Sequence, residues 1–189
     1  MIEKRYKDIH VIIDVLQGKE DEELSILAKR IVSFLCKKDF GLTDLEIEVD
    51  KNGKKRIVNH PNIDFSISHT FGCVVVAVRE NGKIGIDTEK VHKISEKVIN
   101  RFFSENEKRK ISNSVNSEFV ETLIWTKKEA YIKCVGEGIS KKNLTTDTEI
   151  IGRVVHGEEH LCKGKVPSFA YWSMLVESYI VTICFEDNV

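Results

Sequence analysis

The sequence lacks three features that would place the protein in a special class. Its five cysteines are odd in number and include no C-x-x-C pair, which predicts reduced core thiols and not a disulfide framework. No apolar run is long enough for a membrane span or a signal peptide. The formal net charge of -1 gives no strongly basic surface. We therefore expect a cytoplasmic protein that binds neither membranes nor nucleic acid.

Size and composition predict one compact unit. The chain has 189 residues, which is enough for a sizeable core and near the size of one ordinary domain. Charged residues make up 31% and apolar residues 41%, which is the usual balance of a globular protein.

Hydrophobic spacing predicts one helix and then several strands in the first half. Apolar residues recur at helical spacing over residues 21–36. Strict alternation over residues 45–49, followed by Asp-Lys-Asn-Gly, predicts a strand and a turn. Apolar runs at 65–68 and 73–78 predict two more strands, and a Glu-Asn-Gly turn leads into a third at 84–89. We expect these three strands to form an antiparallel meander.

The second half is predicted to run from helices back to strands. Ser104 and Glu107 form a capping box, which starts a helix. A longer helix is predicted over residues 118–135, ending at the glycine that follows it. Strands are predicted at 169–176 and 179–185. This last pair resembles the pair at 65–78, and by pattern alone an internal duplication and two ordinary hairpins are equally favoured.

Two carboxylates stand together in the segment Ile-Gly-Ile-Asp-Thr-Glu. Residues two apart on a strand point to one face, so Asp87 and Glu89 project together while Ile84 and Ile86 enter the core. Like charges this close are usually stabilised by a cation, and oxygen ligands in small number suit Mg²⁺. Taken alone, the segment is explained more simply as an exposed acidic strand end.

The longer helix adds an acid and a base on one stripe. Trp125, Glu129 and Lys133 stand at i, i+4 and i+8. A surface ion pair would explain the last two equally well, but a Trp on the same stripe indicates a partly buried face. We therefore predict that Glu129 joins Asp87 and Glu89 in one carboxylate cluster. Such a cluster would bind a divalent cation and, through it, a phosphorylated substrate.

Two further segments carry groups that bind phosphate. Ser68 and His69 end a strand with a hydroxyl and an imidazole, although a lone histidine is more often structural. Lys54, Lys55 and Arg56 follow the Asn-Gly turn and could bind phosphate as well, although a basic turn is usually only solvated.

Five segments, in this order, resemble the phosphopantetheinyl transferases of the longer, surfactin-synthetase-activator type. They are Phe65-Ser-Ile-Ser-His69, Ile84-Gly-Ile-Asp-Thr-Glu-Lys90, Arg101-Phe-Phe-Ser-x-x-Glu107, Trp125-Thr-x-Lys-Glu-Ala-Tyr-x-Lys133 and Gly136-Glu-Gly-Ile-Ser140. No segment is specific by itself, but the ordered set is. The resemblance implies transfer of the 4'-phosphopantetheine group from coenzyme A to a serine of an apo acyl or peptidyl carrier protein, with Mg²⁺ as cofactor.

The resemblance also implies roles for residues at the matching positions. Asp87 and Glu89 match the metal-binding acids, and Glu129 matches the acid that completes the metal site or acts as base. Lys133 matches the lysine that contacts the diphosphate of coenzyme A. Asp87, Glu129 and Lys133 are therefore the expected catalytic residues.

Other matching positions are implied to bind coenzyme A. Ser68 and His69 match the phosphate-binding pair, and Lys54 matches the lysine of a Gly-Lys-Pro turn that here reads Gly-Lys-Lys. The family's basic and aromatic cluster around the adenine and 3'-phosphate has no counterpart in the short N-terminal region. The candidates to replace it are Arg30, Lys37 and Lys38.

For the fold, the resemblance implies an α+β pseudodimer. Its two similar α/β halves, residues 1–95 and 96–189, would each be a small antiparallel sheet packed with helices. The active site would lie between the halves, and the protein would be a monomer. The stretch 91–103, with Lys97 and Arg101, would present a basic and apolar surface to an acidic carrier protein.

Three alternatives remain open at this point. The chain is also compatible with a coenzyme A or carrier-protein binding module without turnover, and with a Mg²⁺-dependent phosphohydrolase. The spacing of His156, His160 and Cys162 is loosely compatible with zinc, but the two glutamates between them favour a solvated loop.

Overall fold

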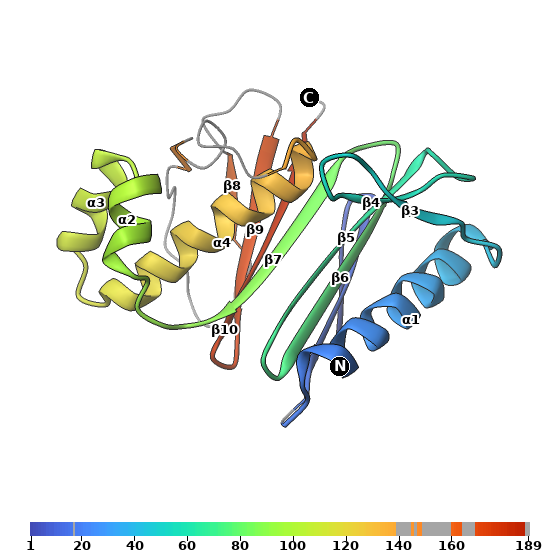
Figure 1. The fold of residues 1–189 in the computed structure, drawn as a ribbon, viewed down its shortest axis with the longest axis horizontal. Helices are drawn as coiled ribbons and strands as arrows, with labels where there is room; N and C mark the ends of the chain where they lie inside the picture. Colours follow the sequence, from blue (N-terminus) through green and yellow to red (C-terminus); the bar gives the residue numbers. More distant parts are fainter. Residues whose placement is uncertain (17, 139–144, 146, 149–159, 164–168, 188–189) are drawn as a thin grey trace.

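The computed structural model describes residues 1–16, 18–138, 145, 147–148, 160–163 and 169–187. Two four-stranded antiparallel sheets lie between two long helices, α1 (Asp21–Phe40) and α4 (Ser117–Val135) (Figure 1). The first sheet has the order β1-β2-β6-β5, with bounds Ile2–Tyr6, Ile9–Val15, Cys73–Glu80 and Ile63–Thr70. The second has the order β7-β10-β9-β8, with bounds Ile84–Lys90, Tyr179–Glu186, Phe169–Val176 and His160–Lys163. The predicted α+β class is confirmed.

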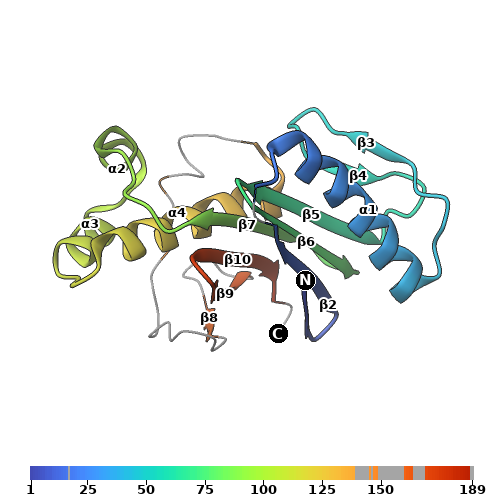
Figure 2. The same ribbon diagram turned by 90° about the horizontal axis from the view of Figure 1, so that it is seen from below.

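The largest core lies between the two sheets. It joins side chains such as Val11 and Val75 of the first sheet to Ile86 and Ile183 of the second, and all four are fully buried. The outer face of the first sheet packs on α1, and the outer face of the second packs on α4 (Figure 2). The central strands of both sheets are therefore covered on both faces. This explains the uninterrupted apolar run of β6.

Most predicted elements are confirmed, with small changes in their bounds. Helix α1 extends four residues beyond its predicted end and stops at Gly41, which adopts a left-handed conformation. The capping box of α3 (Glu105–Ser112) is present, because Ser104 accepts from the Glu107 N–H and Glu107 accepts in return. Helix α4 ends at Gly136, with φ of 71°.

Several elements were not predicted, among them the short strands β4 (Lys55–Ile57) and β8, the latter within a stretch expected to be a solvated loop. The N-terminal segment forms the hairpin β1–β2, and a short helix, α2 (Glu96–Phe102), precedes α3. Strand β2 follows an exposed, charged β1, so the apolar run that marks it is short. Helix α2 is only seven residues long, and its apolar residues Val98, Ile99 and Phe102 are partly buried, so the segment is too short to show a clear helical period.

The predicted meander is wrong in its third strand. Strand β7 does not pair with β6 but with β10, in a register that sets Asp87 opposite Thr182. The turn after β6 thus carries the chain from one sheet to the other and does not close a hairpin. Pairing between segments about ninety positions apart leaves no local signal, whereas the Asn-Gly pair is a typical hairpin turn. The crossing places β7 directly against α4.

The remaining described elements frame the ends of α4. The hairpin of β3 (Ile47–Val49) and β4 (Lys55–Ile57), whose first strand and turn were predicted, lies at the C-terminal end of that helix. Helices α2 and α3 pack at its N-terminal end. No helix in the described ranges is both long and apolar enough to cross a membrane. Cysteines 36, 73, 134 and 184 are buried free thiols, as predicted.

Candidate active site

The site lies where the edge strands of the two sheets, β5 and β7, meet, and we call this contact the seam. Strand β5 is the edge of the first sheet and β7 is the edge of the second. Side chains of β5 replace the missing backbone ladder: Asp64 Oδ2 accepts from the Ile84 N–H at 2.9 Å, and Ser66 Oγ accepts from the Ile86 N–H at 3.0 Å. Alternate residues of β5 point to this side, so the next one along, Ser68, also faces β7. The seam fixes the two strands that carry the polar groups of the site.

We expect Ser66→Ala to destabilise the protein more than an ordinary loss of a buried hydroxyl. Without Ser66 Oγ the buried Ile86 N–H loses its acceptor, which costs about 1–3 kcal/mol of folding free energy. The matched control is Ser173→Ala, because among the described residues that hydroxyl bonds only to the Thr182 hydroxyl, at 3.0 Å. Urea unfolding of both variants measures the difference. Equal losses in the two variants would show that the seam contact has no special weight.

A glycine brings α4 onto the seam. A Cβ at Gly85 would lie 2.1 Å from the Ala130 carbonyl oxygen and 2.2 Å from the Cys134 backbone nitrogen. No side chain fits there, so the backbone of α4 rests directly on β7. This close approach sets the spacing between the acids of β7 and the polar residues of α4.

Three side chains from three elements converge beside this contact. Lys133 Nζ of α4 donates to Asp87 Oδ1 of β7 at 2.7 Å and to Ser68 Oγ of β5 at 3.0 Å. Ser68 Oγ in turn donates to Asp87 Oδ1 at 2.8 Å. Asp87 and Ser68 are buried, and Lys133 is about one-third exposed. The structure thus brings together three residues that the sequence predicted for the site.

The other two predicted acids are perturbed by the same group of charges. Burial raises the pKa of Glu129 to about 7, and the negative charges of Asp87 and Glu89 add to the shift, while Lys133 opposes it. Burial and the charge of Asp87 also raise the pKa of Glu89. The three carboxyl groups therefore influence one another electrostatically, and their predicted metal-binding role stays a prediction.

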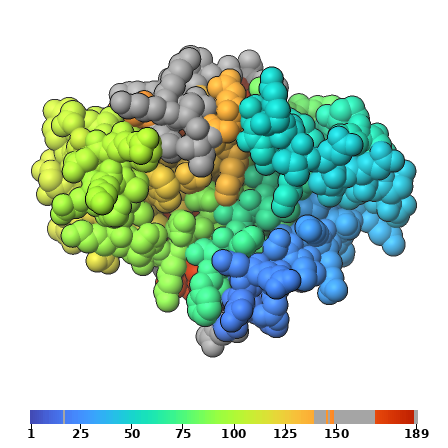
Figure 3. All heavy atoms as spheres, viewed as in Figure 1, coloured from blue at the N-terminus to red at the C-terminus, as the bar shows by residue number. Residues whose placement is uncertain are grey.

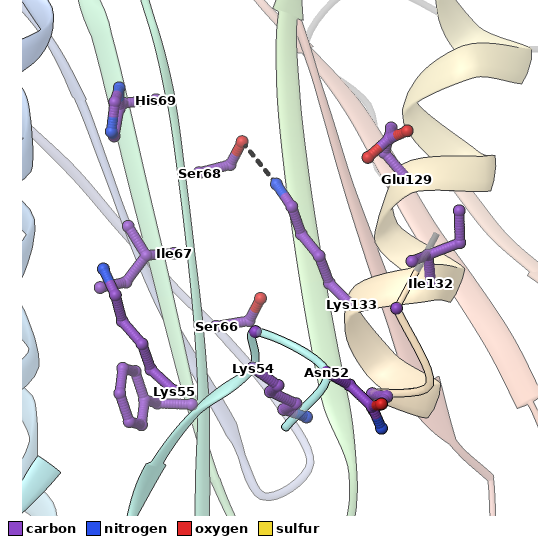
Figure 4. A pocket seen from close by; sticks show the side chains of 14 residues that line it. Asn52, Lys54, Lys55, Ser66, Ile67, Ser68, His69, Glu129, Ile132 and Lys133 are labelled. Atoms are coloured by element: carbon purple, nitrogen blue, oxygen red, sulfur yellow. Dashed lines mark hydrogen bonds between the residues drawn. The ribbon is translucent and has the colours of Figure 1, made fainter. Parts of the chain in front are cut away.

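A cavity of about 410 Å³ opens at this group. It is lined by Asn52, Gly53, Lys54, Lys55, Phe65, Ser66, Ile67, Ser68, His69, Glu129, Ile132, Lys133, Gly136 and Gly138. Figure 4 shows Ser66 and Ser68 of β5 pointing towards α4, Ile67 and His69 pointing to the other side of β5, and the turn before β4 at one end. In the space-filling view the orange end of α4 reaches the surface in a narrow strip beside this turn (Figure 3).

Lys54 reaches the cavity, but its ammonium group is engaged by protein atoms. Its Nζ lies 2.6 Å from Asp64 Oδ2, and it donates to the carbonyl oxygens of Ile84 at 3.2 Å and Cys134 at 3.5 Å. The side chain is only 8% exposed. Lys54 therefore connects β5 and β7 to the C-terminal end of α4. Its contact with coenzyme A remains a prediction.

His69 lies in the cavity wall as predicted. Its Nδ1 is buried, finds no hydrogen-bond partner in the described part of the chain, and lies 3.6 Å from Asp21 Oδ1. The His69 side chain therefore lines the cavity with its Nδ1 towards Asp21, at the start of α1.

The donor set suits a hard divalent cation. Asp87 Oδ2 is buried and has no hydrogen-bond partner among the described residues. Burial and the charge of Asp87 raise the pKa values of Glu89 and Glu129, a cation would oppose that shift, and carboxylate oxygens are the ligands that Mg²⁺ prefers. Within the described ranges, no three His, Cys, Asp or Glu side chains are gathered closely enough to enclose an ion. The chemistry of the residues fits the metal, although the arrangement is not that of a closed metal cage.

Several predicted residues lie elsewhere. Trp125 is partly buried as expected, but it packs on Phe102 with ring centroids 6.4 Å apart and does not line the cavity. Arg30 lines a separate cavity beside α1, and Lys38 pairs with Glu3 at 2.7 Å. Lys37 does not line the active-site cavity either. The zinc alternative lies outside the description, which covers neither His156 nor the side chains of His160 and Cys162.

Sequence reasoning missed two residues that shape the site. Gly85 lies inside a strand, and a glycine there signals close approach of another backbone. The sequence therefore contained this signal, but it did not indicate which segment approaches Gly85. Asp64 had no signal at all, because only the folded chain shows that it holds both Lys54 and the Ile84 N–H.

Comparison with known proteins locates the chain among its relatives. Residues 83–184 match the family model described as the 4'-phosphopantetheinyl transferase superfamily. The chain is 32% identical over 126 residues to the 4'-phosphopantetheinyl transferase ffp of Bacillus subtilis. It is 35% identical over 129 residues to the transferase gsp of Aneurinibacillus migulanus and 31% identical over 126 residues to Sfp of Bacillus subtilis (strain 168). Each match covers 65% of this chain but only 56%, 52% and 56% of the respective relative, so the chain spans about half of their length.

Proposed function

The chain belongs to the 4'-phosphopantetheinyl transferase superfamily, and on that basis we propose that it transfers the 4'-phosphopantetheine group from coenzyme A to a serine of an acyl or peptidyl carrier protein. The observation that carries this proposal is the cavity where Ser68, Glu129 and Lys133 meet beside Asp87. It offers donors for a diphosphate and a carboxylate whose pKa is close to neutral pH.

The residues of the cavity suit the steps of such a transfer. Ser68, His69 and Lys133 would hold the diphosphate of coenzyme A, and Lys133 keeps one of its three donors free of the contacts with Asp87 and Ser68. Glu129 would accept the proton of the carrier serine while the serine oxygen bonds to the phosphorus that carries the phosphopantetheine group. The bond from that phosphorus to the bridging oxygen breaks, and adenosine 3',5'-bisphosphate leaves. The protein contributes position and countercharge.

We propose that Asp87, Glu89 and Glu129 hold Mg²⁺. When bound, this ion would supply positive charge to the diphosphate and the departing phosphate. Two observations support the assignment: Asp87 Oδ2 is buried without a hydrogen-bond partner among the described residues, and the pKa values of the two glutamates are raised.

We propose that α2 contributes to carrier binding. Lys97 and Arg101 stand one turn apart on this helix, and both are exposed. An acidic carrier protein would be complementary to them. If reversing both charges leaves the apparent affinity for the carrier unchanged, α2 is not part of the carrier-binding surface.

We also propose that the protein is an internal duplication that acts as a monomer in the cytoplasm. In each sheet the strand before the long helix, β2 or β7, pairs with the second strand of the later hairpin, β6 or β10. This repeated order supports two similar halves with the cavity between them. The pairing of β7 with the second sheet favours a division before Ile84 over the one predicted near residue 95.

The proposal predicts a mass shift on a carrier protein. Incubation with coenzyme A, Mg²⁺ and a panel of apo carriers should add one phosphopantetheine mass to the carrier serine, and excess chelator should stop the addition. Intact-protein mass spectrometry measures the shift, with heat-inactivated protein as the control. Coenzyme A binding without any shift would indicate a binding module, and adenosine bisphosphate release without carrier would indicate a phosphohydrolase. Either result would overturn the proposal.

A further inference from the structure

The charges of the cavity leave one lysine without a countercharge. Three lysines line it: Lys54, Lys55 and Lys133. Lys54 is paired with Asp64, and Lys133 is paired with Asp87. In the described part of the chain, Lys55 has no carboxylate within ion-pair distance and no hydrogen-bond partner. The two paired lysines add little net positive charge to the cavity, so Lys55 provides most of what an anionic ligand would meet.

Strand alternation explains why the two neighbouring lysines differ. Lys54 immediately precedes β4 and Lys55 is its first residue, and successive side chains of an extended chain point to opposite sides. Lys54 points to the seam and to the end of α4, where all three of its donors are used. Lys55 has the opposite direction: it lines the cavity, and in Figure 4 its side chain extends towards His69 on the side of β5 away from Lys133. Its ammonium group keeps three donors for a ligand.

We infer that Lys55 is a substrate-binding residue that holds a phosphate group of coenzyme A. This inference rests on the proposed function for the identity of the ligand. It assigns to Lys55 the contact that the matching position in the sequence had suggested for Lys54. Lys54 instead keeps the wall of the cavity in place through Asp64 and the two carbonyl oxygens.

The experiment measures coenzyme A binding directly, by titration calorimetry without carrier protein. Lys55→Gln should raise the Kd for coenzyme A about tenfold at low salt, because one charge-assisted contact to phosphate is lost. The difference should shrink as salt is added, since the contact is partly exposed. Lys55→Arg, which keeps the charge, should restore most of the affinity. The melting temperature of Lys55→Gln should stay that of the unchanged protein, because this side chain makes no hydrogen bond or ion pair within the described residues.

Lys51 provides a matched control. It lies in the same hairpin turn, is exposed, and does not line the cavity. Lys51→Gln removes the same charge and should leave the Kd within about twofold, because charges at a distance are screened. Equal weakening in the two variants would overturn the inference, because it would show a general effect of charge. An unchanged Kd in Lys55→Gln would overturn it as well.

A second ligand distinguishes which phosphate Lys55 holds. If the effect of Lys55→Gln disappears with 3'-dephospho-coenzyme A, the contact is to the 3'-phosphate; if it persists, the contact is to the diphosphate. Both results support the inference. Because the assay needs no transfer, it separates the two proposals. Binding that depends on Lys55 without any carrier modification would refute the transferase proposal alone, and failure of the unchanged protein to bind coenzyme A would refute both.

Discussion

Gly85→Ala should abolish transfer and destabilise the protein by about 3 kcal/mol or more, since overpacking against a rigid backbone is the costly case. The added methyl group would lie 2.1 Å from the Ala130 carbonyl oxygen and 2.2 Å from the Cys134 nitrogen. These are backbone atoms of one turn of α4, so no side-chain rotation can make room. The helix would have to move away from β7 and carry Glu129 and Lys133 with it. A displacement of about 1 Å at a catalytic group is enough to cost about a hundredfold in rate.

The control for this variant is Ile86→Val, a small change of volume at the next position of the same strand. Ile86 is fully buried between the sheets, and the loss of one methyl group there should cost about 1 kcal/mol. Thermal unfolding and the transfer rate are measured for both variants. If Gly85→Ala keeps the stability and rate of the unchanged protein, the close contact between α4 and β7 does not position the site.

The parts of the fold that were predictable from sequence are those specified by neighbouring residues. The capping box of Ser104 and Glu107 and the left-handed glycine after α4 act within one turn, so a pattern reveals them. The pairing of β7 with β10 depends on segments far apart in the chain. The Asn-Gly turn favoured a hairpin with β6 instead, because a turn signal depends on neighbouring residues and carries no information about a distant strand.

The site divides in the same way. The carboxylates of β7 and the stripe of α4 were visible because strand and helix periods place Asp87 with Glu89, and Glu129 with Lys133. Their meeting with Ser68 was expected only through the resemblance, and the structure places Ser68 and Lys133 on the same Asp87 oxygen. The engagement of Lys54 by Asp64 was not predictable, since both partners look like solvated charges in the sequence.

Glu129→Gln should stop transfer and yet stabilise the protein above neutral pH. As the proposed base, Glu129 should account for about a hundredfold to ten-thousandfold in rate. Its folded-state pKa of about 7 lies above the ordinary value of 4.5, so the folded protein binds this proton more tightly than the unfolded chain does. Below pH 4.5 the carboxyl group is protonated in both states and costs nothing. Between pH 4.5 and 7 the group ionises in the unfolded chain but stays protonated in the folded protein, so about 1–3 kcal/mol of stability is lost over this range and no more is lost above it.

The variant has no ionisable group at this position, so its advantage in stability should appear only as the pH rises from about 4.5 to 7. Urea unfolding in metal-free buffer at pH 5 and pH 8 measures this, since a bound cation would favour the ionised form. Glu118→Gln is the control, because it removes an exposed carboxyl group from the same helix and should show no such pH dependence. If Glu129→Gln is no more stable at pH 8 than the unchanged protein, ionisation of Glu129 does not lower the free energy of unfolding. Glu129 would then lack the raised basicity that proton transfer from a serine requires, and its proposed role as base would fail with it.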